Sequence, residues 1–483
     1  MAISIIHIVR NSLKFTSVNF LAAVIAMPVT MYVATILVPE EYGVFGFLGL
    51  WLTYAGLIGP GITIAGQTDI PVLLGRGKQH EALRIQNIAI TSEMLYSIIP
   101  FIVILGASFF FSEPVLKFGL IIIAFSYAAR KTVNYWSGMN LIREKFNIVA
   151  KGNLVTAIVP LVLIAASVYW IRVYALIIAP IAGAIALGIY YRRRGPIKFR
   201  FTFDKSETIR LVKVGVVLQS SAFMYWGFRL ADRTIIAATL PLEQLGLYIF
   251  AMQFLMFILL LPEDFGSVLQ PILWREAGKA KSIFEGFKDA KRIAVYMALG
   301  TAILIPIAQL GFYLVVNLIT TQYIGSIAIF CILSYNLYLI TIVSIPAKIL
   351  KSSLVKRQHI LLCFYALGLG LNIIFDFLVI KLGYGVVGVA WVTICTQGLV
   401  TFILYHCIKS YIFKDTREFL RFQVRIFFPF LITIPFYFFH NYLNLVTSSL
   451  WTFGGISLAA QVVLWSIVIS IFYRDYLSIN DIK

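Results

Sequence analysis

Three charged residues lie close together inside one long apolar stretch of the sequence. Arg229, Asp232 and Arg233 fall within the run that extends from Val212 to Leu240. If the run is a helix, spacings of three and four residues place all three side chains on one flank. Two cations and one anion leave a net positive charge, which suits a diphosphate or an acidic sugar. The alternative is an internal ion pair that joins this segment to a neighbour, although one carboxylate cannot neutralise both guanidinium groups.

Two aromatic residues precede this group by one to two helical turns. Tyr225 and Trp226 could stack on sugar rings, whereas aromatic residues in apolar helices more commonly pack against other side chains. At the helical rise, Arg229 is expected roughly 16 Å and Asp232 roughly 12 Å from the end of the run near Leu240. The pattern therefore predicts a positively charged site for an anionic, sugar-bearing ligand at depth.

Four acidic residues inside apolar stretches are candidates for ion coupling. Glu263 and Asp264 are adjacent, and neighbouring carboxylates at low dielectric repel each other, so one of them could bind a proton reversibly. The alternative is that both are neutralised by the basic residues that follow them. Asp376 and Glu93 are lone acids in apolar stretches. Each is a candidate proton site, although such an acid is more often a satisfied polar contact within the bundle.

Basic residues at the ends of several apolar stretches could form a cationic vestibule. Arg130, Lys131 and Lys348 lie at ends that the charge pattern predicts to face the cytoplasm. Together they could collect a diphosphate headgroup from the inner leaflet. The alternative is ordinary anchoring to anionic membrane lipid.

The composition identifies the solvent in which these charges must lie. Of the 483 residues, 60% are apolar and 13% are charged, and the mean hydropathy is +0.90. Soluble chains are about half apolar and a quarter charged, so the excess predicts burial in a bilayer. The net charge of +19 comes from short connectors between apolar runs, which argues against a nucleic-acid partner. The four cysteines show no C-x-x-C spacing and there is no P-loop, so no disulfide, metal, cofactor or direct use of ATP is expected.

Hydropathy and punctuation by proline, glycine and polar residues predict about fourteen transmembrane helices, each near the length of ~20 residues that a bilayer requires. Their predicted ranges are Phe15–Val38, Tyr42–Gly66, Ile85–Phe111, Leu116–Ser137, Asn147–Trp170, Val173–Tyr191, Val212–Leu240, Gln244–Leu273, Ile293–Leu314, Tyr323–Ala347, Ile360–Ile380, Tyr384–Ile408, Phe422–Phe439 and Ser449–Tyr473. Alternate connectors, starting with the N-terminus, carry 35 of the 40 Lys and Arg residues. The remaining connectors carry only Lys117, Arg172 and Lys381. This asymmetry predicts that both termini are cytoplasmic.

The chain resembles itself after a shift of 203 residues. Glu40 and Gly43 then meet Glu243 and Gly246, within a shared pattern of E-x-x-G followed by an aromatic residue. A parallel repeat of six spans plus six is typical of transporters, whose substrate sites lie between the halves. We therefore expect an N-lobe over residues 1–191, a cytoplasmic linker over 192–211, a C-lobe over 212–408 and two additional helices over 409–483.

The residues around these motifs resemble a known superfamily. The stretch LVPEEYG at 37–43, the pair Asp232-Arg233 followed by Pro241 and GLY at 246–248, and Asn372 followed by GYGVVGVA at 383–390 are similar to the multidrug/oligosaccharidyl-lipid/polysaccharide (MOP) exporters. Within them, fourteen spans and a basic character are most like the Wzx-type O-antigen and capsule flippases. The resemblance implies an all-α membrane fold of two pseudo-symmetric six-helix bundles in a MATE-like V.

The resemblance also implies a function. The expected cargo is a polyprenyl-diphosphate-linked oligosaccharide, moved across the cell membrane by alternating access coupled to H⁺ or Na⁺. Other polysaccharide-assembly membrane proteins would be its partners. A lipid II flippase shares this fold, and a cation-coupled multidrug antiporter would need twelve spans and an acidic cavity. A polyprenyl-linked membrane glycosyltransferase or polymerase could use Glu40 and Glu41 to bind a metal, but Glu40 recurs as Glu243, which favours a structural role and a transporter rather than an enzyme.

Overall fold

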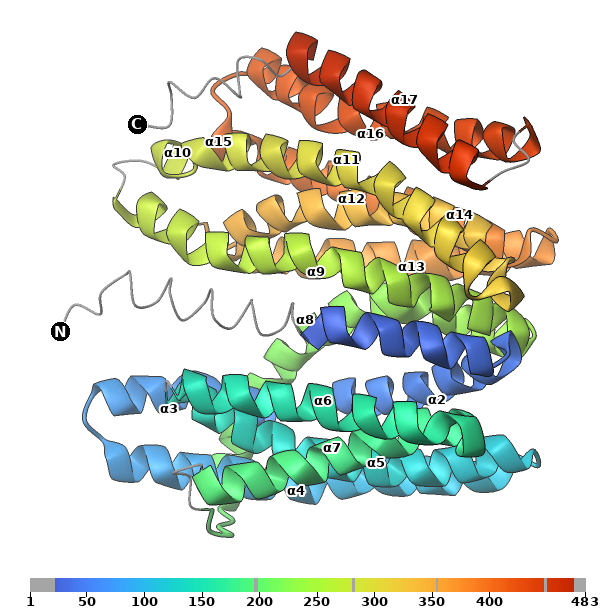
Figure 1. The fold of residues 1–483 in the computed structure, drawn as a ribbon. Helices are drawn as coiled ribbons and strands as arrows, with labels where there is room; N and C mark the ends of the chain where they lie inside the picture. Colours follow the sequence, from blue (N-terminus) through green and yellow to red (C-terminus); the bar gives the residue numbers. More distant parts are fainter. Residues whose placement is uncertain are drawn as a thin grey trace. The chain divides into compact units, whose positions relative to one another are not determined.

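The computed structural model describes residues 22–143, 145–194, 199–279, 283–352, 355–446 and 450–472, and the regular structure in these ranges is entirely helical. The chain divides into two compact units, Met1–Ile249 and Phe250–Lys483. The boundary between these units falls inside one long helix, α9 (Leu242–Lys279), which Figure 1 labels. The two lobes expected from the repeat remain a prediction.

Unit 1 is a bundle of apolar helices. α6 packs on α7, α4 lies against α3 and α5, α5 also contacts α2 and α7, and α8 packs on α2 and α3. The helices are Ala22–Ile36, α2 (Pro39–Leu57), α3 (Ile62–Gly75), α4 (Gln79–Ala107), the 3₁₀ turn η1 (Ser108–Phe110), α5 (Pro114–Ile142), α6 (Phe146–Ile171), α7 (Val173–Arg194), α8 (Lys205–Thr239) and the first turns of α9 (Leu242–Lys279).

Unit 2 is organised around α12, most of whose side chains are buried against α11, α14 and α16. Tyr335 on α12 donates a hydrogen bond to the carbonyl of Thr433 at 3.0 Å, and Tyr338 donates one to the carbonyl of Ile426. Both carbonyls lie in α16 near Pro429 and Pro435, which interrupt its own hydrogen bonding. The helices of this unit are the rest of α9, α10 (Ile283–Gly286), α11 (Lys288–Leu318), η2 (Thr321–Tyr323), α12 (Ser326–Lys351), α13 (Gln358–Lys381), α14 (Gly385–Cys407), α15 (Lys409–Ile412), α16 (Thr416–Val446) and α17 (Leu450–Phe472).

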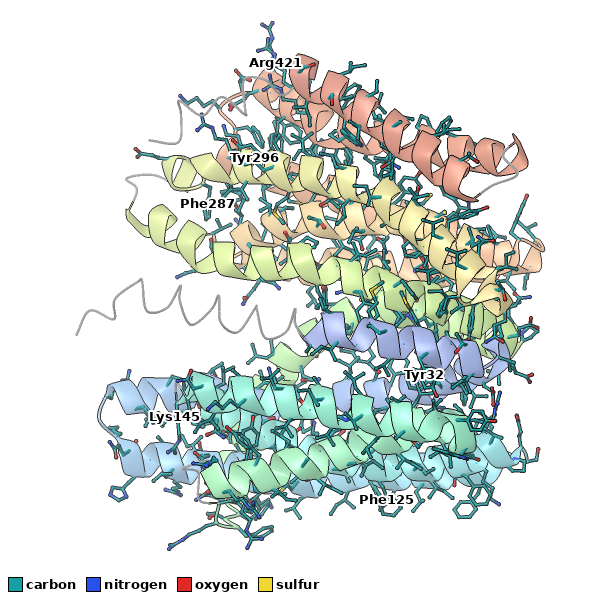
Figure 2. The ribbon with its side chains drawn as sticks, viewed as in Figure 1. Tyr32, Phe125, Lys145, Phe287, Tyr296 and Arg421 are labelled. Atoms are coloured by element: carbon teal, nitrogen blue, oxygen red, sulfur yellow. The ribbon has the colours of Figure 1, made fainter. Side chains whose placement is uncertain are left out.

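The described parts of the predicted membrane spans are mostly helical, and the second span is interrupted at residues 58–61. Nine helices there are long and apolar enough to cross a bilayer, or ten if the bent pair formed by α2 and α3 is one span. Two shorter apolar helices, Ala22–Ile36 and Gly454–Ser470, and the more polar α5 and α16 cover the other predicted spans. Large apolar side chains such as Phe125 and Tyr32 are exposed on the helix surfaces, as expected of lipid-facing residues (Figure 2). The all-α membrane class is therefore confirmed.

The repeated glycine motif forms a close helix crossing within unit 1. A Cβ atom on Gly43 would lie 1.8 Å from the carbonyl oxygen of Leu242, and one on Gly246 would lie 1.7 Å from that of Pro39. The shift of 203 residues places Pro39 on Leu242 and Gly43 on Gly246, so the two contacts are reciprocal. The first turns of α2 and α9 therefore meet backbone to backbone. Only glycine leaves room for this approach, and Glu40 and Glu243 lie in the first turns of these helices, where negative charge is favourable.

We predict that Gly43→Ala and Gly246→Ala each lower the stability of the protein by about 2–3 kcal/mol, because the added methyl group meets rigid backbone. Thermal unfolding of the purified protein in detergent, followed by tryptophan fluorescence, measures this effect. Gly49→Ala and Gly56→Ala are matched controls on α2, since nothing lies within 4 Å of a Cβ atom at either position. Equal behaviour of all four variants would contradict the crossing.

Candidate functional site

The predicted charged group on α8 lies in a polar cluster of unit 1. Asp232 is only 2% exposed, and its carboxylate accepts hydrogen bonds from the Tyr248 hydroxyl and, at 2.7 Å, from the backbone N–H of Arg233. The hydroxyls of Tyr54 on α2 and Thr234 on α8 lie 2.6 Å apart beside it. The Nε atom of Arg233 is buried and makes no hydrogen bond with any described residue. The structure thus brings α2, α8 and the start of α9 together around this carboxylate.

Arg229 lies one turn before this carboxylate, among aromatic rings of its own helix. Its Nη1 atom donates a 2.8 Å hydrogen bond to the Tyr225 hydroxyl. Its guanidinium carbon lies 5.5 Å from the centre of the Tyr225 ring and 5.4 Å from that of Trp226, which is typical of cation–π contacts. The two aromatic residues therefore orient the guanidinium group. Their predicted stacking on sugar rings remains a prediction.

The hydroxyl partners of this cluster were not among the site residues predicted from the sequence. Tyr248 is the clearest omission, and the repeat contained the signal for it. Residues 29 and 45, which correspond to Asp232 and Tyr248 after the shift of 203, are Val29 and Phe45. The second repeat therefore gains a carboxylate and a hydroxyl together, which indicates that the two groups interact.

The sequence predicted that Glu93 is a lone acid. In the structure, Lys131 pairs with it. The Lys131 ammonium lies 2.8 Å from one carboxylate oxygen, and the two side chains are only 18% and 3% exposed. The other carboxylate oxygen accepts a 3.3 Å hydrogen bond from the N–H of Thr63. Lys131 also lies 5.9 Å from the centre of the Tyr135 ring. These contacts join α3, α4 and α5.

Thr63 belongs to a break in the second predicted span. α2 and α3 are bent by 51° across the sequence Ile58-Gly59-Pro60-Gly61, where Gly61 has φ of 62°. Gln219 on α8 donates a 2.5 Å hydrogen bond to the carbonyl of Leu57, the last residue of α2. A Cβ atom on Gly215 would lie 2.4 Å from the carbonyl oxygen of Gly61. Neighbouring helices thus satisfy the two backbone ends that the break exposes.

We predict that Glu93→Gln and Lys131→Gln each reduce stability by about 3 kcal/mol, because each leaves one buried charge without its counterion. The double variant removes both charges and should recover part of that loss. A double-mutant cycle from thermal or denaturant unfolding measures the coupling. Strictly additive effects of the two substitutions would show that the pair is not energetically linked.

The three residues predicted to form a vestibule lie in different surroundings in the structure. Arg130 and Lys131 are adjacent in sequence, but Lys131 contacts Glu93 whereas Arg130 lines a separate cavity against α6 and α7. Lys348 lies half-buried on α12 in unit 2. A common vestibule of these three residues stays a prediction.

The remaining acidic candidates belong to α9 and α13. Asp376 and Asn372 are fully buried one turn apart on α13, and neither polar atom of the Asn372 amide has a hydrogen-bond partner in the described part of unit 2. Glu263 and Asp264 fall on α9, but their side chains lie outside the described residues. In the part of the chain that the structure covers, no three His, Cys, Asp or Glu residues are grouped as metal ligands.

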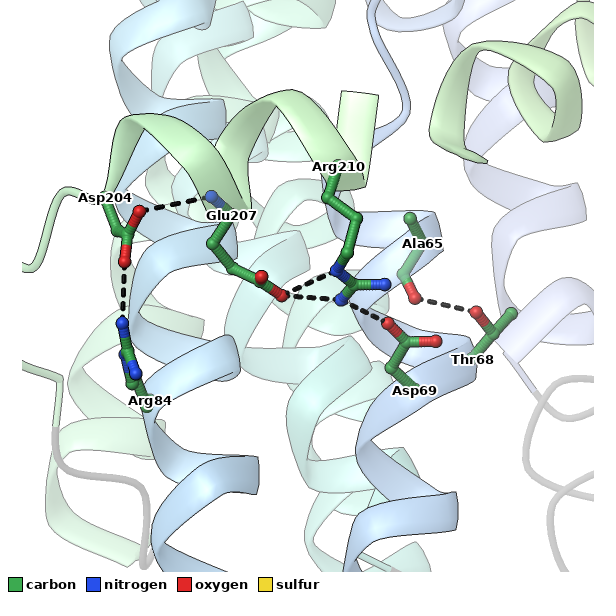
Figure 3. Close-up of polar contacts among 7 residues, drawn as sticks. All are labelled: Ala65, Thr68, Asp69, Arg84, Asp204, Glu207 and Arg210. Atoms are coloured by element: carbon green, nitrogen blue, oxygen red, sulfur yellow. Dashed lines mark hydrogen bonds and ion pairs between the residues drawn. The ribbon is translucent and has the colours of Figure 1, made fainter. Parts of the chain in front are cut away.

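A polar network fixes the start of α8 (Figure 3). The Asp204 carboxylate accepts the N–H of Glu207 at 3.1 Å, which caps the helix, and a 2.6 Å hydrogen bond from Arg84 on α4. These hydrogen bonds hold the pKa of Asp204 below its ordinary value. Arg210 bridges Glu207 at 2.6 Å and Asp69 on α3 at 2.7 Å. The helix that carries Arg229 is thereby tied to α4 at its N-cap and to α3 in its second turn.

Comparison with known proteins gives a family and a fold. The model of a family described as polysaccharide biosynthesis protein matches residues 8–275. No curated protein sequence matches the chain. The chain is similar in structure to the lipid II flippase MurJ in an inward closed conformation, with a TM-score of 0.70 at 14% identity over 96% of this chain and 99% of that chain.

Two further solved structures share the fold. An inward-facing multidrug resistance MATE family transporter of the MOP superfamily has a TM-score of 0.60 at 12% identity, over 83% of this chain and 98% of that chain. A MOP superfamily transporter from Pyrococcus furiosus, described as having a binding pocket of reverse polarity, has a TM-score of 0.56 at 13% identity, over 85% and 96%. At such low identities these likenesses establish the fold alone.

Proposed function

Because the chain belongs to the polysaccharide biosynthesis protein family, within the MOP exporters, we propose that it moves a polyprenyl-diphosphate-linked oligosaccharide from the inner to the outer leaflet by alternating access. The chain is a multi-pass membrane protein with the fold of lipid-linked flippases and transporters. The cargo, the cell membrane as its location, cytoplasmic termini and partners among other polysaccharide-assembly membrane proteins are part of the proposal. So are the lobes over residues 1–191 and 212–408 and the additional helices over 409–483.

The charge balance on α8 is the observation that carries the proposal. Arg229 and Arg233 share one carboxylate, that of Asp232, so the described cluster keeps a net positive charge within a spanning helix. Charge at such depth is costly and usually lines a substrate path. An anionic diphosphate or acidic sugar suits this cluster, whereas the cation of a multidrug antiporter would be repelled by it.

We predict that Arg229→Gln and Arg233→Gln each reduce glycan export about 10- to 100-fold, as expected when one charge-assisted hydrogen bond to the cargo is lost. Arg229→Lys and Arg233→Lys should retain more activity, because the charge remains. Surface glycan and lipid-linked intermediates in each leaflet are measured in a deletion strain that carries each variant. Arg192→Gln, an exposed position at the end of α7, is the control. Full export by the Arg229→Gln/Arg233→Gln double variant would remove the assignment.

A lipid II flippase is the second candidate function, because the likeness to MurJ extends over 96% of the chain. Both cargoes carry a diphosphate on a polyprenyl chain, so the charge on α8 suits either. The deletion strain separates the two functions. Loss of surface glycan with normal cell-wall synthesis supports the first function, whereas accumulation of lipid II in the inner leaflet supports the second.

We also propose that translocation is coupled to H⁺ or Na⁺ through Asp376, a carboxylate that is fully buried on a spanning helix. Asp376→Asn keeps the size of the side chain and removes its charge, so transport should lose its dependence on the ion gradient. Transport into proteoliposomes under a proton or sodium gradient provides the measurement, with Asn336→Asp, a buried position on α12, as a control for added charge in the same unit. Unchanged gradient dependence in Asp376→Asn would contradict this role.

A further inference from the structure

A cavity of about 570 Å³ lies inside unit 1, between the helix Ala22–Ile36, α5, α6 and α7. Its volume falls within the range of about 300–1,000 Å³ that is typical of small-molecule sites. Small residues such as Ala26, Ala157 and Gly183 make the space. None of its lining residues belongs to α8, so it is separate from the cluster around Asp232. Its polar lining residues are Arg130, Asn134, Ser137, Asn153 and Thr156, and no acidic residue is among the lining residues that the structure describes.

Arg130 is the distinctive feature of this cavity. It makes no hydrogen bond or ion pair with any described residue, and its side chain remains accessible although it lies roughly 24 Å along α5 from Pro114. Asn134 and Ser137 follow it at spacings of four and three residues, so all three share one helix face. A guanidinium group inside a membrane protein requires water or an anion beside it. The cavity is therefore polar where it meets α5.

The amide groups in the cavity add a second, independent observation. Asn134 on α5 and Asn153 on α6 make no side-chain hydrogen bond with residues in the described ranges, although both line the cavity. Lys131, the neighbour of Arg130, is directed to Glu93 and contributes no charge here. Among the lining residues that the structure describes, the cavity thus has one cation and two amides that can each donate and accept, and no counterion.

We propose that this cavity binds an oxyanion attached to a sugar, with Arg130 holding the anion and Asn134 and Asn153 holding neighbouring hydroxyls. This inference rests on the proposed function, since such a group belongs to the headgroup of the cargo. A guanidinium forms paired hydrogen bonds to phosphate and to carboxylate alike. The anion can therefore come from the diphosphate of the lipid carrier or from an acidic sugar. The site would hold the headgroup at a point distinct from Arg229 and Arg233.

Thiol labelling tests the site without a transport assay. In a background with Cys331, Cys363, Cys395 and Cys407 replaced by alanine, Asn153→Cys is labelled by an anionic and by a cationic methanethiosulfonate of similar size, in phosphatidylcholine nanodiscs. The anionic reagent should react roughly fivefold or more faster, because of the nearby positive charge. Arg130→Gln should abolish this preference, Arg130→Lys should keep it, and Arg192→Gln, outside the cavity, should not change it. Ala157→Cys, a second lining position, replaces Asn153→Cys if that variant does not fold.

Competition identifies the source of the anion. Slower labelling in the presence of inorganic pyrophosphate indicates the carrier diphosphate, and slower labelling with glucuronate but not glucose indicates an acidic sugar.

The proposal is overturned if neither reagent labels the cavity, if the preference survives Arg130→Gln, or if neither pyrophosphate nor glucuronate protects. The proposal is also overturned if labelling of the cavity is slowed only when the nanodiscs contain phosphatidylglycerol. That result would assign the cavity to membrane lipid. The labelling experiment needs no transport, so the site and the proposed function can fail separately. If labelling confirms the site but the deletion strain has normal glycans and normal lipid II, the proposed function is contradicted and the site is not.

Discussion

The hydrocarbon core of a bilayer offers no water to satisfy a polar group, so the backbone ends and charges of a span must find partners within the protein or beside a water-filled cavity. The break between α2 and α3 shows this constraint most directly. The carbonyl of Leu57 is satisfied from α8 by Gln219, and the N–H of Thr63 is satisfied from α4 by Glu93. Glu93 in turn requires a counterion, which Lys131 supplies from α5. One interrupted span thereby ties three further helices together.

The same constraint explains how the cluster on α8 is built. Asp232 is buried where water would otherwise solvate it, and the Tyr248 hydroxyl and the Arg233 N–H take the place of that water. Arg229 is held by the rings of Tyr225 and Trp226, which are less costly partners for a cation than hydrocarbon. Arg130 differs from Asp232 and Arg229, because no described side chain forms an ion pair or hydrogen bond with it. That difference distinguishes Arg130, in the proposed anion site, from charged groups whose partners are already supplied by the protein.

Hydropathy could predict the helices because span length is set by the thickness of the bilayer rather than by the details of packing. Hydropathy could not predict which side chains contact one another across neighbouring helices. In a helix that is apolar all round, periodicity does not show which side faces which neighbour, so Arg130 and Lys131 were expected to act together. Successive residues point about 100° apart around a helix, and the structure places one in a cavity and the other against Glu93. The role of Tyr248 was missed for the same reason, since its carboxylate partner lies on a different helix.

The repeat distinguishes residues that both copies share, which form the helix crossing, from residues that differ between the copies, which carry charge. Gly43 and Gly246 are retained in both copies because each must allow the other helix to approach its backbone. Asp232 and Tyr248 in the second copy replace Val29 and Phe45 in the first, so the two copies share a crossing but not a charge. In the first copy, Ala26 stands where the second has Arg229, and Ala26 lines the cavity that Arg130 enters from α5. The short side chain at residue 26 therefore leaves space in unit 1, and the positive charge of Arg130 lines that space from a different helix.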